Sequence, residues 1–193
     1  MLNGASSSGK TTLLKALQAA FTEPYLDAGI DKFIWMLPGR YLNPPLWQEV
    51  FHYQCDVSGR IIAIYAAERG HQLMSGMHHS IADLARTGNH VLADHVLLES
   101  VWVRECAALF ADLPVWLIGV RCPLDVLIER EQLRKDRTLG QAEVQFHAVH
   151  AHTVYDLEVD TSQSSVDDCV SRILRHVYGD NPPVAFKQLR ELH

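Results

Sequence analysis

The segment Gly4–Thr11, with the sequence GASSSGKT, carries the strongest chemical signal in the chain. It matches the pattern GxxxxGK[ST] at every fixed position, in which glycines let the backbone curl and aim N–H groups at phosphate oxygens. In such a loop Lys10 reaches the β- and γ-phosphates of ATP, and the Thr11 hydroxyl ligates Mg²⁺. The alternative is a serine-rich helix cap without a ligand. The ATP-binding residues predicted in this segment are Gly4, Ala5, Ser6, Ser7, Ser8, Gly9, Lys10, Thr11 and Thr12.

Two aspartates each end a predicted strand, and the carboxyl ends of parallel strands face the ligand crevice. Asp31 could accept the proton of an acceptor hydroxyl, as the loop aspartate does in protein kinases. Asp94 ends the run VLAD and could hold Mg²⁺ through its water shell. Either side chain could instead cap a helix, and Asp94 could be a buried, hydrogen-bonded acid. We therefore expect Thr11 and Asp94 at a metal site and Asp31 in catalysis.

Four basic side chains cluster where a predicted helix enters a polar loop: Arg130, Arg134, Lys135 and Arg137. We interpret residues 130–142 as a lid, because arginines that close onto ATP neutralise charge on the transferring phosphoryl group and exclude water. Arg130 and Arg134 are predicted to bind ATP, and Arg137, at the helix-to-loop transition, is predicted to act in catalysis. A solvated basic helix face, paired with neighbouring glutamates, is the alternative. Arg121, at a strand end, is a second candidate for phosphate contact.

An acceptor pocket is expected within about residues 32–60, because small-molecule pockets are mostly apolar and aromatic. Phe33, Trp35 and Met36 are the candidate acceptor-binding residues, although packing in the core is the more frequent fate of such side chains. Further candidates for the pocket wall are Trp47, Phe51 and Tyr53. His147, His150 and His152 do not share one helix face, so no metal site is expected there.

Strands that alternate with helices position these residues, and this order predicts a parallel α/β sheet. The chain should open on a short strand fragment over residues 1–3 and close on a helix over 166–177. The other predicted strands are 25–31, 89–96, 114–122 and 155–161. The other predicted helices run from the glycine loop to before Pro24, over 99–112 and over 124–133.

Between the second and third strands we expect mainly helix and loop. A short helical turn is predicted over 33–36, a loop over 38–45, and a mostly helical stretch over 47–87 that breaks near Ser58 and Gly59. The kinase domain is predicted to span residues 1–179, and residues 180–193 to form a peripheral tail.

The overall composition favours one compact domain that acts on small molecules. The chain has 193 residues, of which 48% are hydrophobic and 21% charged. Its formal net charge of −6 gives no general attraction to nucleic acid or to an anionic membrane. The four cysteines have no CxxC spacing and are expected to be reduced thiols. Without an apolar run of membrane-spanning length or a secretory leader, the expected location is the cytoplasm.

Several segments together resemble the chloramphenicol phosphotransferase-like family: LNGASSSGKT, AGID, ARTGNHVLAD, GVRC, DR and YDLEVDT. The resemblance runs from about Leu2 to Val177. It implies a P-loop NTPase fold of the nucleoside-monophosphate-kinase type, with a five-stranded parallel sheet flanked by helices. It also implies an ATP-dependent O-phosphotransferase, whose named member phosphorylates a hydroxyl of chloramphenicol. The family's base matches Asp31, its phosphate-loop lysine Lys10, and its lid arginine Arg137.

The leading functional hypothesis is therefore a small-molecule hydroxyl kinase that uses ATP and Mg²⁺, with chloramphenicol or a related amphenicol as candidate acceptor and antibiotic resistance as the corresponding role. One alternative is a kinase of a sugar, of a shikimate-like metabolite, or of a nucleotide sugar as in zeta-type toxins. Another is a nucleotide-gated switch protein without an acceptor. A guanine-specific switch is disfavoured because the chain has no NKxD motif. Asp31 distinguishes the classes, since a switch protein needs no acceptor base.

Overall fold

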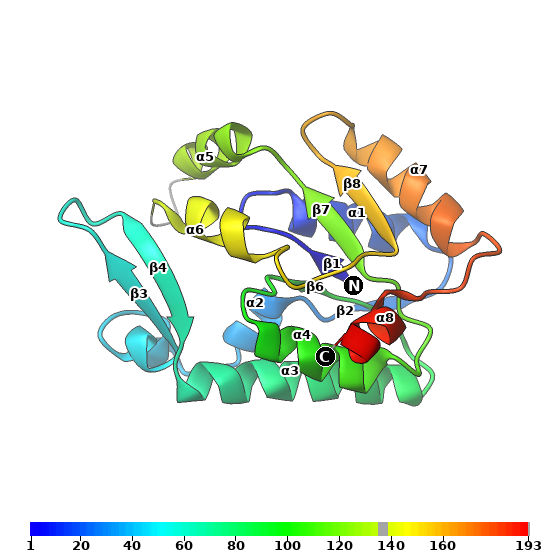
Figure 1. The fold of residues 1–193 in the computed structure, drawn as a ribbon, viewed down its shortest axis with the longest axis horizontal. Helices are drawn as coiled ribbons and strands as arrows, with labels where there is room; N and C mark the ends of the chain where they lie inside the picture. The colour runs from blue at the N-terminus through cyan, green and yellow to red at the C-terminus, as the bar shows by residue number, and fades with distance from the viewer. Residues whose placement is uncertain (135–138, 193) are drawn as a thin grey trace.

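The computed structural model describes residues 1–134 and 139–192, and parallel strands form its centre (Figure 1). The strands are β2 (Tyr25–Asp27), β5 (His90–Leu92), β6 (Asp94–His95), β1 (Leu2–Asn3), β7 (Ile118–Arg121) and β8 (Leu157–Asp160). Only Ala93 separates β5 from β6, so one extended segment pairs with β2 through its first half and with β1 through its second. The prediction of a five-stranded parallel sheet flanked by helices is confirmed.

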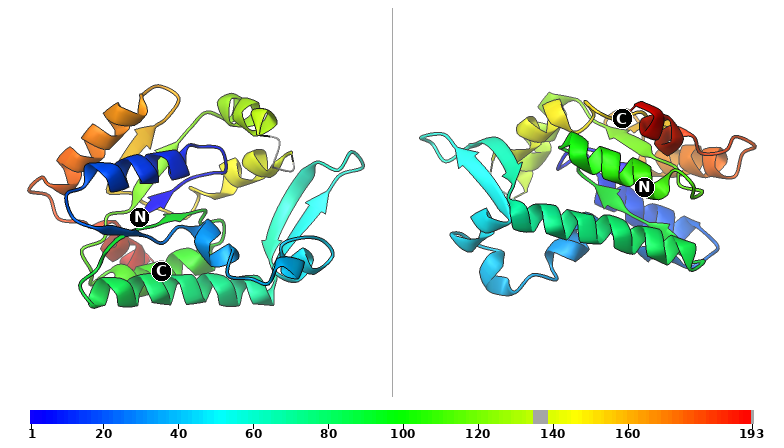
Figure 2. Two further views of the ribbon diagram at one scale, coloured as in Figure 1. Left: turned by 180° about the vertical axis from the view of Figure 1, so that it is seen from behind. Right: turned by 60° about the horizontal axis from the view of Figure 1, so that its bottom comes forward.

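Helices cover both faces of this sheet (Figures 1 and 2). On one face, α1 (Lys10–Ala20) and α7 (Val166–Val177) bury leucines and β-branched residues at helical spacing against the strands. On the other face, α3 (Glu68–Arg86) and α4 (Ser100–Phe110) enclose the larger of the apolar clusters. The resulting three-layer arrangement leaves the carboxyl ends of the strands free to meet the phosphate loop.

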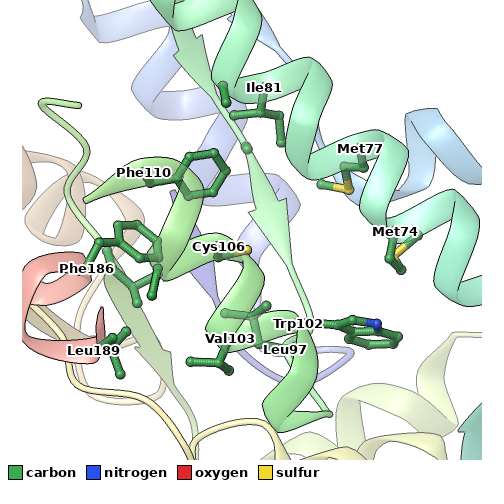
Figure 3. Close-up of a cluster of buried hydrophobic side chains, with 14 of the residues drawn as sticks. Met74, Met77, Ile81, Leu97, Trp102, Val103, Cys106, Phe110, Phe186 and Leu189 are labelled. Carbon is green, nitrogen blue, oxygen red and sulfur yellow. The ribbon is translucent and has the colours of Figure 1, made fainter. Parts of the chain in front are cut away.

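The chain's last helix, α8 (Ala185–Leu192), belongs to this larger cluster. Figure 3 shows its Phe186 and Leu189 among side chains from α3 and α4. Phe186 is 3% exposed and stacks edge-on against Phe110 of α4, with ring centroids 5.2 Å apart. The expectation of a peripheral tail over 180–193 therefore misses this helix, because its three buried apolar residues complete the core. The boundary of the kinase domain stays a prediction.

A β-hairpin replaces much of the helix that we predicted over 47–87. β3 (Phe51–Cys55) pairs antiparallel with β4 (Ile61–Ala66), and α3 begins only at Glu68. The Asp56 carboxylate accepts hydrogen bonds from the backbone N–H groups of Ser58 and Arg60, and Gly59 has a φ of +82°. The Ser58-Gly59 pair is thus a hairpin turn and not a helix break, which explains why the helical prediction was wrong there.

The second predicted strand is shorter than expected. β2 ends at Asp27, whose Oδ1 accepts a hydrogen bond of 3.1 Å from the Gly29 backbone N–H, and α2 (Ile30–Ile34) follows at once. Asp31 therefore lies in the first turn of α2 and not at the end of a strand.

The remaining elements include α6 (Gln141–Ala148), which lies beside the hairpin, and α5 (Leu124–Leu133), which packs against α6 (Figure 1). Two short 3₁₀ helices, Gly39–Tyr41 and Leu46–Glu49, occupy the region that we predicted as loop and as the start of a long helix. The predicted helices over 99–112, 124–133 and 166–177 are confirmed to within two residues.

The buried side chain of Asn3 joins three distant segments at the end of β1. Its Nδ2 donates hydrogen bonds of 2.8 Å to the Val149 carbonyl and to the Tyr155 hydroxyl, and its Oδ1 accepts one of 2.9 Å from the Leu97 N–H. The Tyr155 hydroxyl also lies 2.5 Å from Nδ1 of His150. Because Gly4 follows directly, this network fixes the start of the phosphate loop.

The hydrogen bonds of this network suit a neutral His150. Tyr155 accepts from Asn3 and can donate its own proton to Nδ1, in the tautomer that carries the imidazole proton on Nε2. Burial lowers the pKa of His150 to about 4, and the Arg121 charge acts in the same direction. Because this histidine binds protons more weakly in the folded state, its contribution to stability is present above about pH 6.5 and is lost as the pH falls toward 4.

We predict that His150→Gln, which can still accept the tyrosine proton, removes part of the acid sensitivity of the wild-type protein. The measurement is the free energy of unfolding by urea at several pH values between 7 and 4. The exposed His152, replaced by glutamine, is the matched control and should follow the wild-type profile. Identical pH profiles for His150→Gln and the wild type would contradict the prediction.

We also predict that Phe186→Ala lowers the free energy of unfolding by about 3–5 kcal/mol, because it removes a buried ring and leaves a cavity. The exposed Leu192, replaced by alanine, is the control on the same helix and should change stability by less than about 0.5 kcal/mol. Denaturant titration measures both. An unchanged midpoint for Phe186→Ala would show that α8 does not belong to the core in solution.

Candidate active site

The phosphate loop connects β1 to α1 and has the backbone that anion binding requires. Ser7 and Gly9 have φ angles of +62° and +85°, which turn the loop back on itself. Helix α1 has no side-chain cap and no acidic residue in its first turn, so no residue of the helix itself neutralises its positive dipole end. The buried hydroxyls of Ser7 and Ser8 have no hydrogen-bond partner among the described residues. These features suit a bound phosphate group.

The Lys10 side chain folds back over this loop. It is 6% exposed, and its Nζ donates a hydrogen bond of 2.7 Å to the Ala5 carbonyl. The other predicted loop residues divide into two groups. The first group lines a cavity and comprises Ser6, Ser7, Gly9, Lys10, Thr11 and Thr12. The second group is buried within the loop and does not line that cavity; it comprises Gly4, Ala5 and Ser8.

Asp94 stands opposite the start of α1. Its Oδ2 lies 3.4 Å from the Thr11 hydroxyl, the arrangement that we predicted for a metal site. Burial raises the pKa of the Asp94 carboxyl; Lys10 lowers it, and the nearby carboxylates of Asp31 and Asp27 raise it. A divalent cation beside Thr11 would stabilise the charged form of this cluster.

The surroundings of Gly29 explain why the AGID segment has a glycine. A Cβ at this position would lie 2.2 Å from Oδ1 of Asp94, so a larger residue would displace the Asp94 carboxylate. Asp27, before it, forms an ion pair of 3.0 Å with Lys32 and does not line the cavity. Asp31, after it, is exposed and lines the same cavity as Lys10, Thr11 and Asp94. The fold thus brings the predicted base and the phosphate loop to one cavity, although Asp31 comes from a helix.

The cavity has a volume of about 470 Å³ and continues from the phosphate loop into an apolar chamber under the hairpin. Its polar wall also includes Arg134, Gln141 and Gln145. Its apolar and aromatic wall comprises Ile30, Ile34, Trp35, Leu42, Trp47, Phe51, Tyr53, Ile64, Val96, Leu98 and Trp102. Of the three residues predicted to bind the acceptor, Trp35 lines the cavity. Phe33 packs in the core at 8% exposure, and Met36 faces outward at 70%, so neither belongs to the wall.

A second cavity, of about 400 Å³, lies on the other side of the loop, against Ser7, Gly9 and Thr12. Leu13, Leu133, Val166 and Cys169 form its apolar wall. Arg130 donates to the carbonyl and hydroxyl oxygens of Thr161, at 2.9 and 3.1 Å, and the Thr161 hydroxyl donates to the Ser8 carbonyl at 2.8 Å. Arg130 is therefore tied to the phosphate loop through a single threonine.

The other basic candidates differ in position. Arg134 lines both cavities, as expected for a residue near a nucleotide. Arg121 forms a bidentate ion pair with Glu158 and stacks over Tyr155, so it is not available for the phosphate contact that we considered. Arg137 lies outside the described residues, and its predicted role stays a prediction. The described residues contain no group of three or more His, Cys, Asp or Glu side chains that could hold a metal ion.

Two buried histidines, His78 and His95, form a chain of hydrogen bonds next to Asp94. The Val96 N–H donates to Nδ1 of His95, which leaves Nε2 of His95 to donate to Nε2 of His78, 2.9 Å away. Nδ1 of His78 then donates to the Glu105 carboxylate at 2.5 Å. Burial lowers the pKa of both histidines and so favours their neutral forms, and the hydrogen bonds link β6 to α3 and α4.

Sequence reasoning missed several residues of the site. Thr161 ends the YDLEVDT segment, and this strand-end position was a usable signal. Gln145 and Trp102 reach the cavity from helices that carry no local motif. Ile64 belongs to the hairpin that was predicted as helix.

Comparison with known proteins agrees with this geometry. The family model for chloramphenicol phosphotransferase-like protein matches residues 1–178. Proteins from two strains of Mycobacterium tuberculosis, CDC 1551 and H37Rv, are each 31% identical over 99% of this chain and 87% of their own length. Their names propose an O-phosphotransferase activity. The predicted enzyme class is confirmed at this level. No helix in the described part of the chain is long and apolar enough to cross a membrane.

Similar solved structures support the fold. A sugar kinase from Janibacter sp. HTCC2649 has a TM-score of 0.64 at 14% identity and covers 91% of both chains. The Mycobacterium tuberculosis APS kinase, in complex with AMPPNP and APS, has a TM-score of 0.59 at 13% identity, over 92% of this chain and 95% of that one. A Deinococcus radiodurans tunicamycin resistance protein has a TM-score of 0.58 at 16% identity, over 94% and 95%. With a P-loop kinase fold and a family match over nearly its whole length, the chain belongs to the chloramphenicol phosphotransferase-like family.

Proposed function

We propose that the protein is an ATP-dependent O-phosphotransferase whose acceptor is an uncharged, largely apolar alcohol, with chloramphenicol or a related amphenicol as the named candidate. The observation that carries this proposal is the set of residues that line one cavity. Lys10, Thr11, Asp94 and Asp31 share it with an extended apolar and aromatic wall. A nucleotide-gated switch needs neither an acceptor base nor such a chamber.

On the nucleotide side, residues of the two cavities would bind different parts of MgATP. Bound MgATP would supply the transferable phosphoryl group and the metal that neutralises its charge. The loop N–H groups and Lys10 would hold the phosphates, and Thr11 and Asp94 would hold Mg²⁺ directly or through water. The apolar second cavity, with Leu13, Val166 and Cys169 in its wall, has the size for a nucleobase and ribose.

On the acceptor side, Asp31 would orient the hydroxyl and receive its proton as the new oxygen–phosphorus bond forms. Its position in the first turn of α2 exposes it to the cavity. Because phosphoryl transfer passes through a loose transition state, the proton can move late, and an ordinary carboxylate is a sufficient base.

The charge distribution of the cavity favours a neutral acceptor. Among the described residues, the cationic side chains in its wall are Lys10, which belongs to the phosphate loop, and Arg134, which also lines the second cavity. A carboxylated or phosphorylated acceptor would place a further negative charge in the apolar chamber without a partner of its own among the described residues, which is costly. A sugar would leave most of its hydroxyls against aromatic side chains. These costs argue against the metabolite, sugar and nucleotide-sugar alternatives.

We predict that a screen of acceptors with MgATP gives acceptor-dependent ADP release with amphenicols, and much less with shikimate, simple sugars and nucleotide sugars. Lys10→Ala should reduce this transfer by about 10²-fold or more, because it removes the cation of the phosphate loop. Melting temperature serves as the folding control. Preferential turnover of a charged acceptor would refute the neutral-acceptor proposal, and undiminished transfer by Lys10→Ala would refute the phosphate-loop assignment.

We predict that Asp31→Asn lowers kcat by about 10²–10⁴-fold, because it removes the proton acceptor while keeping the shape of the side chain. MgATP affinity, measured by calorimetry, should change little. Asparagine caps helices about as well as aspartate, so a purely structural role would leave activity intact. Asp27→Asn is the matched control, since Asp27 lies near Asp94 but outside the cavity wall, and it should keep most of the wild-type kcat.

A further inference from the structure

We propose that Gln145 is a positioning residue for Lys10. From helix α6 it fixes a peptide group that accepts a hydrogen bond from the Lys10 ammonium, and so it couples the acceptor side of the cavity to phosphate binding. This inference rests on the proposed role of Lys10 in holding the nucleotide phosphates.

The linkage consists of two hydrogen bonds to opposite ends of the Ala5–Ser6 peptide group. The Ser6 N–H donates to Oε1 of Gln145 at 2.6 Å, and the Ala5 carbonyl accepts from Nζ of Lys10 at 2.7 Å. Gln145 is 4% exposed and Lys10 is 6% exposed, so both bonds are shielded from water. Hydrogen bonding at the N–H end polarises the carbonyl and strengthens it as an acceptor. The glutamine therefore sets both the orientation and the strength of the lysine's contact.

Helix α6 is itself held in place at its first turn. The buried Glu131 carboxylate accepts hydrogen bonds from the N–H groups of Gly140 and Ala142, at 2.8 and 2.7 Å. Glu131 thereby satisfies donors at the start of α6 that have no partner within the helix. Gln145 follows one turn later, on a helix whose register is fixed by this contact.

The same helix is joined to the hairpin that covers the acceptor chamber. The Ile61 N–H donates to the Leu139 carbonyl at 2.9 Å, and Arg60 forms an ion pair of 2.5 Å with Glu143. Figure 1 shows α6 between the hairpin and β1, where the phosphate loop begins. A shift of the hairpin around an acceptor is thus transmitted through α6 and Gln145 to the Ala5–Ser6 peptide group.

The first test is the Ser6 backbone amide of the nucleotide-free protein, observed by NMR. Gln145→Met keeps the length of the side chain but loses the accepting oxygen, and we expect amide hydrogen exchange at Ser6 to become about tenfold faster or more. Gln145→Glu keeps the oxygen and should retain the protection. Gln141→Met, on the same helix and cavity wall, should leave the Ser6 amide unchanged. A folded Gln145→Met variant with wild-type exchange at Ser6 would overturn the proposal.

If Gln145→Met does not fold, Gln145→Glu provides the test, because loss of Ser6 amide protection in that isosteric variant would equally overturn the proposed Gln145–Ser6 linkage.

The second test is kinetic. Gln145→Met should raise the KM for MgATP and lower kcat, each by about tenfold, while the KM for the acceptor stays within about twofold. A change confined to the acceptor KM would show that Gln145 contacts the acceptor instead. A wild-type protein that binds no MgATP would refute the proposed function, whereas the Ser6 measurement would still decide the linkage.

Discussion

The buried amide of Asn3 is the contact on which the geometry of the site most depends. β1 is only two residues long, and its backbone pairing alone cannot fix where the phosphate loop begins. Asn3 adds three side-chain hydrogen bonds that tie the strand to the segments at Leu97, Val149 and Tyr155. Because an unpaired amide in this fully buried position would be costly, the surrounding segments must keep their places relative to β1. The loop that follows therefore starts from a rigid point, although its own backbone is strained at Ser7.

The phosphate loop and its neighbours hold several unfavourable features that no local packing relieves. The hydroxyls of Ser7 and Ser8 are buried without partners among the described residues, α1 lacks a cap, and Asp94 is buried close to two other carboxylates. Each would be a fault in a protein selected for stability alone. A phosphate group and a divalent cation would offset all of them together, the first at the loop and the second at the acids. Local rules are commonly broken at functional sites in this way.

The parts of the molecule that sequence predicts are those specified by contiguous residues. The motif of Gly4–Thr11 fixes both the loop and the start of α1, and the apolar runs before Asp94 and Arg121 are buried on both faces as parallel strands. The hairpin was missed because Ser58-Gly59 interrupts a helix or turns a hairpin equally well in isolation. Asp31 was placed on a strand because the turn made by Asp27 and Gly29 is short and leaves no apolar pattern. Gln145 and Thr161 act through contacts 139 and 153 residues away in the chain, which no local pattern reveals.

The two halves of the cavity are also built differently, and this has consequences for specificity. The phosphate half comes from one continuous segment and the ends of neighbouring strands, so its geometry follows from the sheet itself. The apolar half comes mainly from α2, the second 3₁₀ helix, the hairpin and α4, which all lie outside the parallel sheet. Substitutions at Trp47, Phe51 or Ile64 can therefore reshape the acceptor chamber without moving a phosphate-binding group. Helix α6 is different, because it touches the hairpin through Glu143 and the phosphate loop through Gln145. Substitutions in the hairpin can therefore change which acceptor shapes fit the chamber. They affect phosphoryl transfer only when they displace α6.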